Sequence, residues 1–317
     1  MISRPTRTDW LLLLALGFMW GTSYVFIKVG VQTLPTFTLI ASRLGIGLTV
    51  LATVVVAARE PLPRSPRIYG HLLVMSIVNI VLPFALITTA EISVDSALAA
   101  ILNGAVPLFV IVFAALFLHD EPITVNRLAG LAIGYAGVII LVSRSLGSGL
   151  SQSSFEGELA LIASTALYGA GAVYARRNVR GLRPMIPALF QVLFAFLIVS
   201  VVAVVFERPW TVAWTFNAVG AVVWLGILGS GFAYLANFRL LARIGATRTS
   251  LVAYLLPVVG IIAGAIVLQE TVEARVVFGT ALVIGGVALV NSRFGQRRLF
   301  GRATAGLDDP AGTTTKG

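Results

Sequence analysis

Residues 96–144 read SALAAILNGAVPLFVIVFAALFLHDEPITVNRLAGLAIGYAGVIILVSR, and residues 246–293 read ATRTSLVAYLLPVVGIIAGAIVLQETVEARVVFGTALVIGGVALVNSR. The two segments align when the first is given one extra residue in its turn. Four landmarks then coincide: Pro107 with Pro257, Glu121 with Glu270, Gly130 with Gly279, and Gly137 with Gly286. A shared apolar composition does not place a proline, an acidic residue and two glycines in register. The chain therefore contains an internal duplication.

The composition is that of an integral membrane protein. Hydrophobic residues make up 58% of the 317 residues, charged residues make up 11%, and the mean hydropathy is +0.95. The chain has no cysteine, and His71 and His119 fall in no metal-binding pattern, so we expect neither a metal nor another cofactor. The net charge of +10 lies in segments between apolar runs, which favours membrane topology over nucleic-acid binding as its cause.

Ten apolar runs of about twenty residues predict ten transmembrane helices in an all-α membrane protein. Five belong to a first repeat at 10–144 and five to a second repeat at 157–293. A short N-terminal segment (1–9), a Gly- and Ser-rich linker (145–156) and a tail expected to be disordered (294–317) complete the chain. The predicted spans are 10–30, 35–57, 70–90, 94–118, 125–143, 157–176, 187–206, 218–240, 247–268 and 275–292.

The basic residues predict the orientation. Of the 23 Lys and Arg residues, 18 fall on one side when the spans alternate, and the positive-inside rule makes that side cytoplasmic. Both termini are then cytoplasmic. Five spans per copy is an odd number, so the two copies have opposite orientations in the bilayer. Such a 5+5 inverted-topology repeat is typical of secondary transporters.

Polar residues recur on one face of six predicted spans, the first, third, fourth, sixth, eighth and ninth. The third span corresponds to the eighth, the fourth to the ninth, and the first to the sixth, so the polar faces follow the repeat. We expect these faces to line a central cavity. Its candidate residues are Trp20, Tyr24, Arg43, Asn79, Asn103, Pro107, Tyr168, Gln191, Tyr234, Asn237, Tyr254 and Pro257.

The matched prolines lie near the middle of their spans. A proline frees a backbone carbonyl one turn earlier, and paired interruptions at corresponding positions are typical of a binding site. A plain structural kink is the alternative. Trp20 and Tyr168 also match, at an offset of 148 residues, and form either an aromatic wall of the cavity or part of the packed core.

Arg43 is the charged residue that lies deep within a predicted span. One hypothesis is that it attracts an anionic group of a substrate; the other is a structural role at freed carbonyls, because Gln191 at the matching position is neutral. No Asp or Glu lies in the middle of a predicted span. Facilitated diffusion or exchange is then at least as plausible as proton coupling, although coupling at a carboxylate near a span end stays open.

The fifth and tenth predicted spans carry small residues and almost no polar ones. This pattern predicts close helix packing at the periphery, either within the chain or in a homodimer. The glycines expected to pack are Gly130, Gly134, Gly137, Gly279, Gly285 and Gly286.

Together these residues resemble the drug/metabolite transporter superfamily, in particular its EamA-type members. The resemblance is carried by Trp20-Gly21 and Lys28 in the first span, Arg43 in the second, and the two blocks from proline to the second glycine. It covers residues 10–293. It implies an inner-membrane protein of ten helices, with a cavity lined by the same six spans. Members of the family often export amino acids, other metabolites or drugs.

We therefore predict a secondary transporter that moves a small organic solute by alternating access. Export of an amino acid or related metabolite is the leading prediction, and a proton-coupled exporter of drugs or toxic compounds is the alternative. A channel is less consistent with an inverted repeat that carries no ring of like charges. An enzyme would need a nucleophile–base pair or metal ligands at depth, and the sequence has neither. The expected partners are the solute and membrane lipid, not nucleic acid, with the chain a monomer or homodimer.

Overall fold

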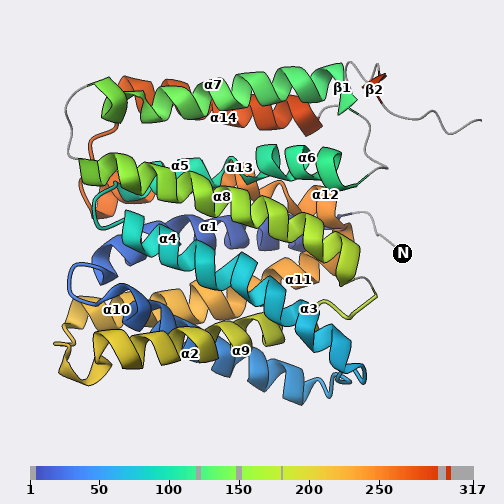
Figure 1. Cartoon of the computed structure of the whole chain (residues 1–317), viewed down its shortest axis with the longest axis vertical. Helices are drawn as coiled ribbons and strands as arrows, with labels where there is room; N and C mark the ends of the chain where they lie inside the picture. The colour runs from blue at the N-terminus through green and yellow to red at the C-terminus, as the bar shows by residue number, and fades with distance from the viewer. Residues whose placement is uncertain (1–4, 119–122, 148–151, 180, 292–297, 301–317) are drawn as a thin grey trace, which may run out of the picture.

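The computed structural model describes residues 5–118, 123–147, 152–179, 181–291 and 298–300, so Glu121, His119 and most of the 294–317 tail lie outside the described residues. Its helices lie side by side with roughly parallel axes (Figure 1). The N-terminus lies at the right of that view. We call this the N-terminal end of the bundle and the opposite side, at the left, the far end.

The first half of the chain forms five helical passes between the two ends. α1 and α2 are continuous. The third pass runs from α3 through a π-helical segment, η1, into α4, and the fourth consists of two short helices, α5 and α6. The bounds are α1 Arg7–Gly30, α2 Thr36–Ala57, α3 Pro66–Ser76, η1 Ile77–Val81, α4 Leu82–Ala90, α5 Ser96–Asn103, α6 Val106–Phe117 and α7 Val125–Gly147.

The second half repeats this plan. Its first helix, α8, begins at the far end, whereas α1 begins at the N-terminal end (Figure 1). The bounds are α8 Gln152–Asn178, α9 Met185–Val202, η2 Ala203–Glu207, η3 Pro209–Thr211, α10 Phe216–Trp224, η4 Leu225–Phe232, α11 Ala233–Ile244, α12 Ala246–Thr249, α13 Val252–Val267 and α14 Ala274–Asn291.

The described residues contain eight helical segments that are long and apolar enough to cross a membrane, and two shorter apolar helices, Val252–Val267 and Ala274–Val290. The chain is therefore a multi-pass membrane protein with an all-helical core. Each predicted span coincides with one of these segments to within a few residues. Two short strands, β1 (Ile123–Thr124) and β2 (Arg298–Phe300), pair antiparallel.

Two predicted boundaries differ from the structure. The 145–156 linker is shorter than predicted, because α7 continues to Gly147 and α8 begins at Gln152. The tail was expected to lack structure, yet its residues 298–300 form β2. Their backbone groups pair with β1, which lies just before α7, so hydrogen bonding to a neighbouring strand gives these three residues an extended conformation.

α7 and α14 pack on each other at one edge of the bundle, at the top of Figure 1. A methyl group on Gly130 would come within 2.6 Å of the Gly286 carbonyl oxygen, and one on Gly137 within 2.8 Å of the Gly279 oxygen. A methyl group on Gly134 would meet the Leu108 side chain, and one on Gly286 would meet the Gly134 backbone. The glycines thus let the two backbones approach closely. Packing of Gly285 within the chain, one of the two predicted alternatives, was wrong, because a methyl group there would meet nothing within 4 Å. The other alternative, a contact between two copies of the chain, stays a prediction.

The two matched prolines do not both interrupt their helices, contrary to the prediction. In the first copy the helix breaks at Gly104-Ala105, and Pro107 lies in the first turn of α6, where its missing N–H is not needed. In the second copy α13 continues through Pro257. The repeat alignment places Tyr254 where the first copy has Gly104, and glycine is the poorer helix former. The Pro257 ring lies against Gly104, within 2.7 Å of a methyl group built there.

A π-helical segment, in contrast, occurs at the same place in both halves. η1 begins at Ile77 and η4 at Leu225, which are 148 residues apart, the offset that also relates Trp20 to Tyr168. A π turn contains one residue more than an α-helical turn, and π turns are frequent at functional sites. The third pass of each half therefore carries the same local widening at the same depth.

Candidate functional site

Arg43 lies near the middle of α2 and is only 3% exposed. Its Nε donates a hydrogen bond to Ser230 Oγ on η4 at 3.3 Å, and its guanidinium lies over the Phe84 ring of α4, 4.4 Å from the centroid. α2 and η4 can approach closely because Gly47 and Gly226 face each other's helix: a methyl group on Gly47 would lie 2.6 Å from Ser230 Cβ. The glycines therefore place the hydroxyl beside the guanidinium.

Three tyrosines surround the guanidinium. Tyr24 of α1, Tyr168 of α8 and Tyr234 of α11 all lie close enough to Arg43 to interact electrostatically with it. Tyr234 also contacts Trp20 edge to face at a centroid distance of 6.3 Å. Five of the residues predicted from the sequence are therefore brought together at one place. We call Arg43, Phe84, Ser230, Tyr24, Tyr168, Tyr234 and Trp20 the central cluster.

The positive charge of the central cluster has no ion-pair partner. Among the described residues, no carboxylate lies within salt-bridge distance of Arg43. A buried cation without a counter-ion is costly, and a cation–π contact offsets only about 0.5–2 kcal/mol of that cost. An anionic group beside the guanidinium would offset that cost, and aromatic side chains lie next to this position.

Asn79 and Gln191 form a separate group that is already satisfied. The Asn79 amide donates to Gln191 Oε1 at 3.2 Å, and Gln191 Nε2 donates to the Pro187 carbonyl at 3.0 Å. Ser76 Oγ donates to the Gln191 backbone carbonyl at 2.8 Å. Asn79 Oδ1 also fills the space beside Gly171, where a side chain would overlap it. These contacts join η1 to α9 and α8.

The remaining candidates lie around the helix break. Asn103 is 3% exposed, and its Nδ2 has no hydrogen-bond partner within the described part of the chain. Pro107 follows the break, and Pro257 packs against it. Tyr254 is half-buried and packs against the main hydrophobic core. Asn237 is half-buried on α11, and no contact described for it joins it to the central cluster.

Contacts at the far end join the two halves of the chain. The Glu207 carboxylate accepts the backbone N–H groups of Phe37 and Thr38, at 2.9 and 2.6 Å, and so caps α2. The Glu270 carboxylate accepts the N–H groups of Ser96 and Ala97, at 2.8 and 3.0 Å, and caps α5. A carboxylate at a helix N-terminus is stabilised by the exposed amides and the helix dipole.

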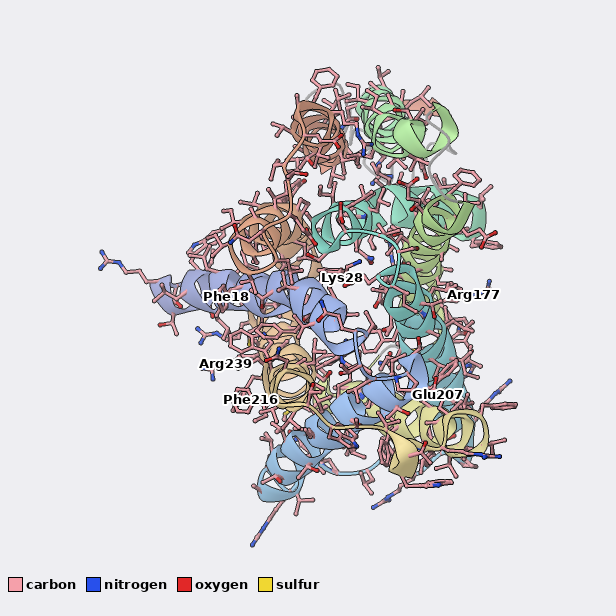
Figure 2. The ribbon with its side chains drawn as sticks, turned by 90° about the vertical axis from the view of Figure 1, so that its left-hand side faces the viewer. Phe18, Lys28, Arg177, Glu207, Phe216 and Arg239 are labelled. Atoms are coloured by element: carbon pink, nitrogen blue, oxygen red, sulfur yellow. The ribbon has the colours of Figure 1, made fainter. Side chains whose placement is uncertain are left out.

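Lys28 adds a third far-end contact. Its Nζ donates to the Glu91 and Val94 carbonyls, at 2.7 and 2.8 Å, and so joins the end of α1 to the turn between α4 and α5. Figure 2, which looks along the bundle from the far end, shows Lys28 beside that turn, whereas Arg177 and Arg239 lie toward the outside.

At the N-terminal end, the described contacts include two salt bridges and a hydrogen bond. Arg183 forms a salt bridge with Glu60 at 2.9 Å, and the Arg183 side chain is 65% exposed. Arg243 lies 3.4 Å from the Asp9 carboxylate. Tyr174 and His71 share a hydrogen bond of 2.8 Å between α8 and α3. An exposed ion pair such as Arg183–Glu60 contributes about 0–1 kcal/mol.

Sequence reasoning missed several of these roles. Neither the caps made by Glu207 and Glu270 nor the contact of Phe84 with Arg43 was predicted. One signal was available for α2: Pro35 precedes this helix, and proline has no side-chain group that could cap it. Trp224 was also missed; it stacks on Phe26 at 4.5 Å and donates to Thr22 Oγ1 at 3.2 Å.

The central cluster does not line either of two pockets found at the surface. One, of about 270 Å³, lies between α4 and α8 at the far end, and another, of about 410 Å³, lies between α2 and α9. Within the residues that the structure describes, no group of three or more His, Cys, Asp or Glu could hold a metal ion. The buried polar groups at the centre are therefore enclosed by the packed helices in this conformation.

Comparisons with known proteins agree with this architecture. The model of the EamA-like transporter family matches the chain twice, at residues 9–143 and 155–292. The chain is 28% identical over 282 residues to the uncharacterized inner membrane transporter YedA of Escherichia coli K12, covering 88% of this chain and 89% of that protein.

Two more distant relatives cover nearly the whole chain. The uncharacterized transporter YoaV of Bacillus subtilis is 23% identical over 287 residues, covering 90% of this chain and 98% of its own length. A crystal structure superposes with a TM-score of 0.64 at 23% identity, covering 90% of this chain and 96% of that one, which shows a shared fold. Since the family model matches most of the sequence, in two copies, the chain belongs to the EamA-like transporter family.

Proposed function

We propose that this protein is a secondary transporter of the inner membrane that exports a small organic solute carrying a carboxylate, such as an amino acid or related metabolite. The observation that carries the proposal is the buried Arg43 guanidinium, which has no carboxylate of the described chain within salt-bridge distance. Transporters of this kind place their substrate groups near the middle of the bilayer, between the repeats.

The surroundings of Arg43 suit an amino acid or a similar amphipathic solute. A carboxylate would take the free edge of the guanidinium, since Nε is held by Ser230. The phenol oxygens of Tyr24, Tyr168 and Tyr234 would hydrogen-bond the polar remainder of the solute, and Trp20 and Phe84 would contact its apolar part. Groups from both halves of the chain contribute, so movement of one half relative to the other would expose the site.

The proposed mechanism is alternating access by a ten-helix protein with both termini in the cytoplasm. The distribution of basic residues supports this orientation, with 18 of 23 on the N-terminal side. The opposite starting ends of α1 and α8 support an inverted repeat (Figure 1). In this conformation the far end, which would face outward, is held by the Lys28, Glu207 and Glu270 contacts.

The aromatic side chains also favour a second candidate, an exporter of flat apolar compounds. Trp20, Tyr234 and Phe238 form a continuous series of aromatic contacts next to Arg43. Such a surface would bind a drug-like molecule mainly through its rings. The two candidates differ in whether a carboxylate is needed for recognition.

Transport by purified protein in liposomes tests both candidates. Labelled amino acids, organic acids and planar organic cations would be compared in the wild-type protein, Arg43→Gln, and Arg177→Gln as a matched control, because Arg177 is exposed. We expect Arg43→Gln to lower the flux of carboxylate-bearing solutes at least about tenfold and to spare solutes without a carboxylate. Equal flux of a carboxylate solute in all three proteins would refute the role of Arg43.

A further inference from the structure

Glu91 is a buried carboxylate that the proposed transport site does not use. It follows the last residue of α4, is 0% exposed, and neither of its carboxylate oxygens has a hydrogen-bond partner among the described residues. It differs in this respect from Glu207 and Glu270. Each of those two carboxylates accepts hydrogen bonds from two backbone N–H groups. An ionised carboxylate is not stable in such surroundings, whereas a protonated carboxyl group is.

Charged and titratable groups surround Glu91 on several elements. Lys28 and Tyr24 lie on α1, Arg43 on α2, and Glu270 in the turn before α14. α8, which packs on α4, carries Glu156 and Glu158. Burial is the strongest influence and raises the pKa of Glu91 well above its ordinary value; the Lys28 charge opposes this effect, and the Glu270 charge adds to it.

Lys28 is the group that could neutralise an ionised Glu91, but its ammonium is engaged elsewhere. It donates to the backbone carbonyls of Glu91 and Val94 rather than to the Glu91 carboxylate. The contact between α1 and the α4–α5 turn therefore exists in a form that requires no negative charge on Glu91. If Glu91 became ionised, its carboxylate would compete with the two carbonyls for the same ammonium.

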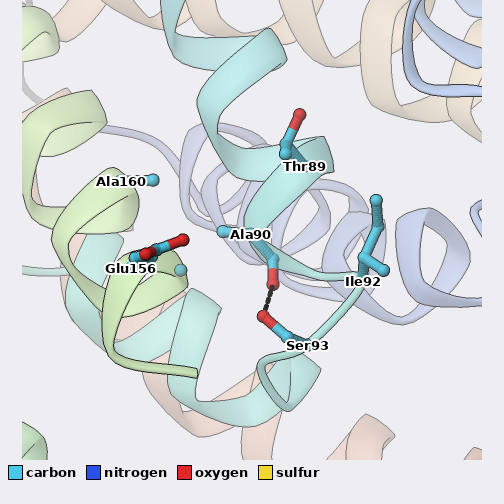
Figure 3. A pocket seen from close by; sticks show the side chains of 7 residues that line it. Thr89, Ala90, Ile92, Ser93, Glu156 and Ala160 are labelled. Atoms are coloured by element: carbon cyan, nitrogen blue, oxygen red, sulfur yellow. Dashed lines mark hydrogen bonds between the residues drawn. The ribbon is translucent and has the colours of Figure 1, made fainter. Parts of the chain in front are cut away.

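Glu91 lies between two residues that line a surface pocket. Its chain neighbours Ala90 and Ile92 both line the pocket of about 270 Å³ between α4 and α8. Figure 3 shows this pocket with Glu156 on one side and Ser93, whose hydroxyl contacts the Ala90 carbonyl, on the other. Glu91 itself does not line the pocket, so its carboxyl group lies next to a water-accessible space without being exposed to it.

We propose that Glu91 is a proton-binding site that controls opening of the far end, an inference that rests on the proposed alternating-access function. With the proton bound, α1 and the α4–α5 turn are joined as they are here. Loss of the proton to water at the far end leaves a carboxylate that either draws Lys28 away from the two carbonyls or moves out toward water. Both movements release the turn from α1 and open the path to the central cluster.

Thermal unfolding of purified protein in detergent between about pH 5 and 9 is the first test. A group with a raised pKa in the folded state contributes stability that is lost as the pH rises through that pKa. We expect the melting temperature of the wild-type protein to fall by about 2–4 °C over this range and that of Glu91→Gln to stay constant. Glu207→Gln, the matched control at the same end, should melt lower at every pH but keep the wild-type slope. A wild-type slope in Glu91→Gln would overturn the proposal.

Thiol labelling is the second test, because the chain contains no cysteine of its own. A cysteine at Leu98, which is 8% exposed and lies on α5 just after the turn, reports opening of the far end. A cysteine at Phe216, which is 92% exposed, corrects for thiol ionisation. Relative to that control, we expect labelling at position 98 to rise at least tenfold from pH 6 to pH 8, and to stay slow when Glu91→Gln is added. The same rise with Glu91→Gln would overturn the proposal. Neither test measures flux, so their failure would leave the proposed transport function intact.

Discussion

Arg43 and Gln191 occupy matching positions, 148 residues apart, on the second pass of each half, yet their surroundings differ. The Gln191 amide is saturated by Asn79 and Pro187. Arg43 donates one hydrogen bond, to Ser230, and has no carboxylate beside it in the described chain. The comparison teaches that the duplicated framework supports two different uses of one position. In the second half the residue joins helices, and in the first half its charge has no carboxylate of the described chain within salt-bridge distance.

Gln191→Arg should have the largest effect of the changes that test this comparison. It would bury a second cation among groups that already satisfy one another, and would remove the hydrogen bond to Asn79. We expect a loss of about 3–5 kcal/mol in stability, measured by denaturation in detergent. Gln191→Glu, of similar size, should also destabilise the protein. Wild-type stability of Gln191→Arg would show that this region is less closed than the hydrogen bonds indicate.

Arg43→Gln should lower ligand affinity and leave stability intact, the opposite of what is expected for Gln191→Arg. Removing an unpaired buried charge is expected to leave the melting temperature unchanged or to raise it, whereas affinity for a carboxylate solute should fall ten- to a hundredfold, or about 1.4–2.8 kcal/mol. Binding measured by calorimetry beside thermal unfolding separates the two effects. A lower melting temperature with unchanged affinity would assign Arg43 a structural role like that of Gln191.

Gly104→Ala tests the other difference between the halves, the broken α5–α6 against the continuous α13. The added methyl group would approach the Pro257 ring to 2.7 Å, so we expect a loss of about 1–3 kcal/mol despite the better helix propensity of alanine. The companion variant Gly104→Ala/Pro257→Ala removes the close contact and should recover most of that loss. No recovery in the double variant would mean that the break itself, rather than its contact with Pro257, limits stability.

Gly285→Ala should have the smallest effect. Nothing lies within 4 Å of the added methyl group, so helix propensity alone should stabilise the protein by up to about 1 kcal/mol. Gly286→Ala is the matched control and should destabilise it, because the methyl group would come within 2.5 Å of the Gly134 backbone nitrogen. Equal melting temperatures for the two variants would contradict the packing of α7 on α14.

The positions of the helices could be predicted from the sequence because apolar length and bounding charges are local properties. Trp20, Tyr24, Tyr168 and Tyr234 could be named as candidates from helical spacing and the repeat, but their approach to Arg43 could not, because it depends on how several helices pack together. The cap that Glu207 makes on Thr38 joins residues 169 apart, and no local pattern specifies such a pairing. The prediction that both prolines interrupt their helices was wrong for a related reason. Gly104 and Tyr254, three residues before them, decide whether each helix continues, and the apolar pattern does not distinguish these two positions.

The π-helical turns of η1 and η4 have a mechanical consequence. A π turn holds one residue more than the surrounding α-helix, and that residue can pass along the helix as neighbouring hydrogen bonds exchange partners. Each residue that the extra residue passes turns by about 100° around the helix axis, whereas the two ends of the pass keep their relative orientation. Asn79 lies within η1 and Ser230 within η4, so such a shift would carry both polar groups around their helix axes. It would therefore move the Ser230 hydroxyl relative to Arg43 without rotating the whole pass.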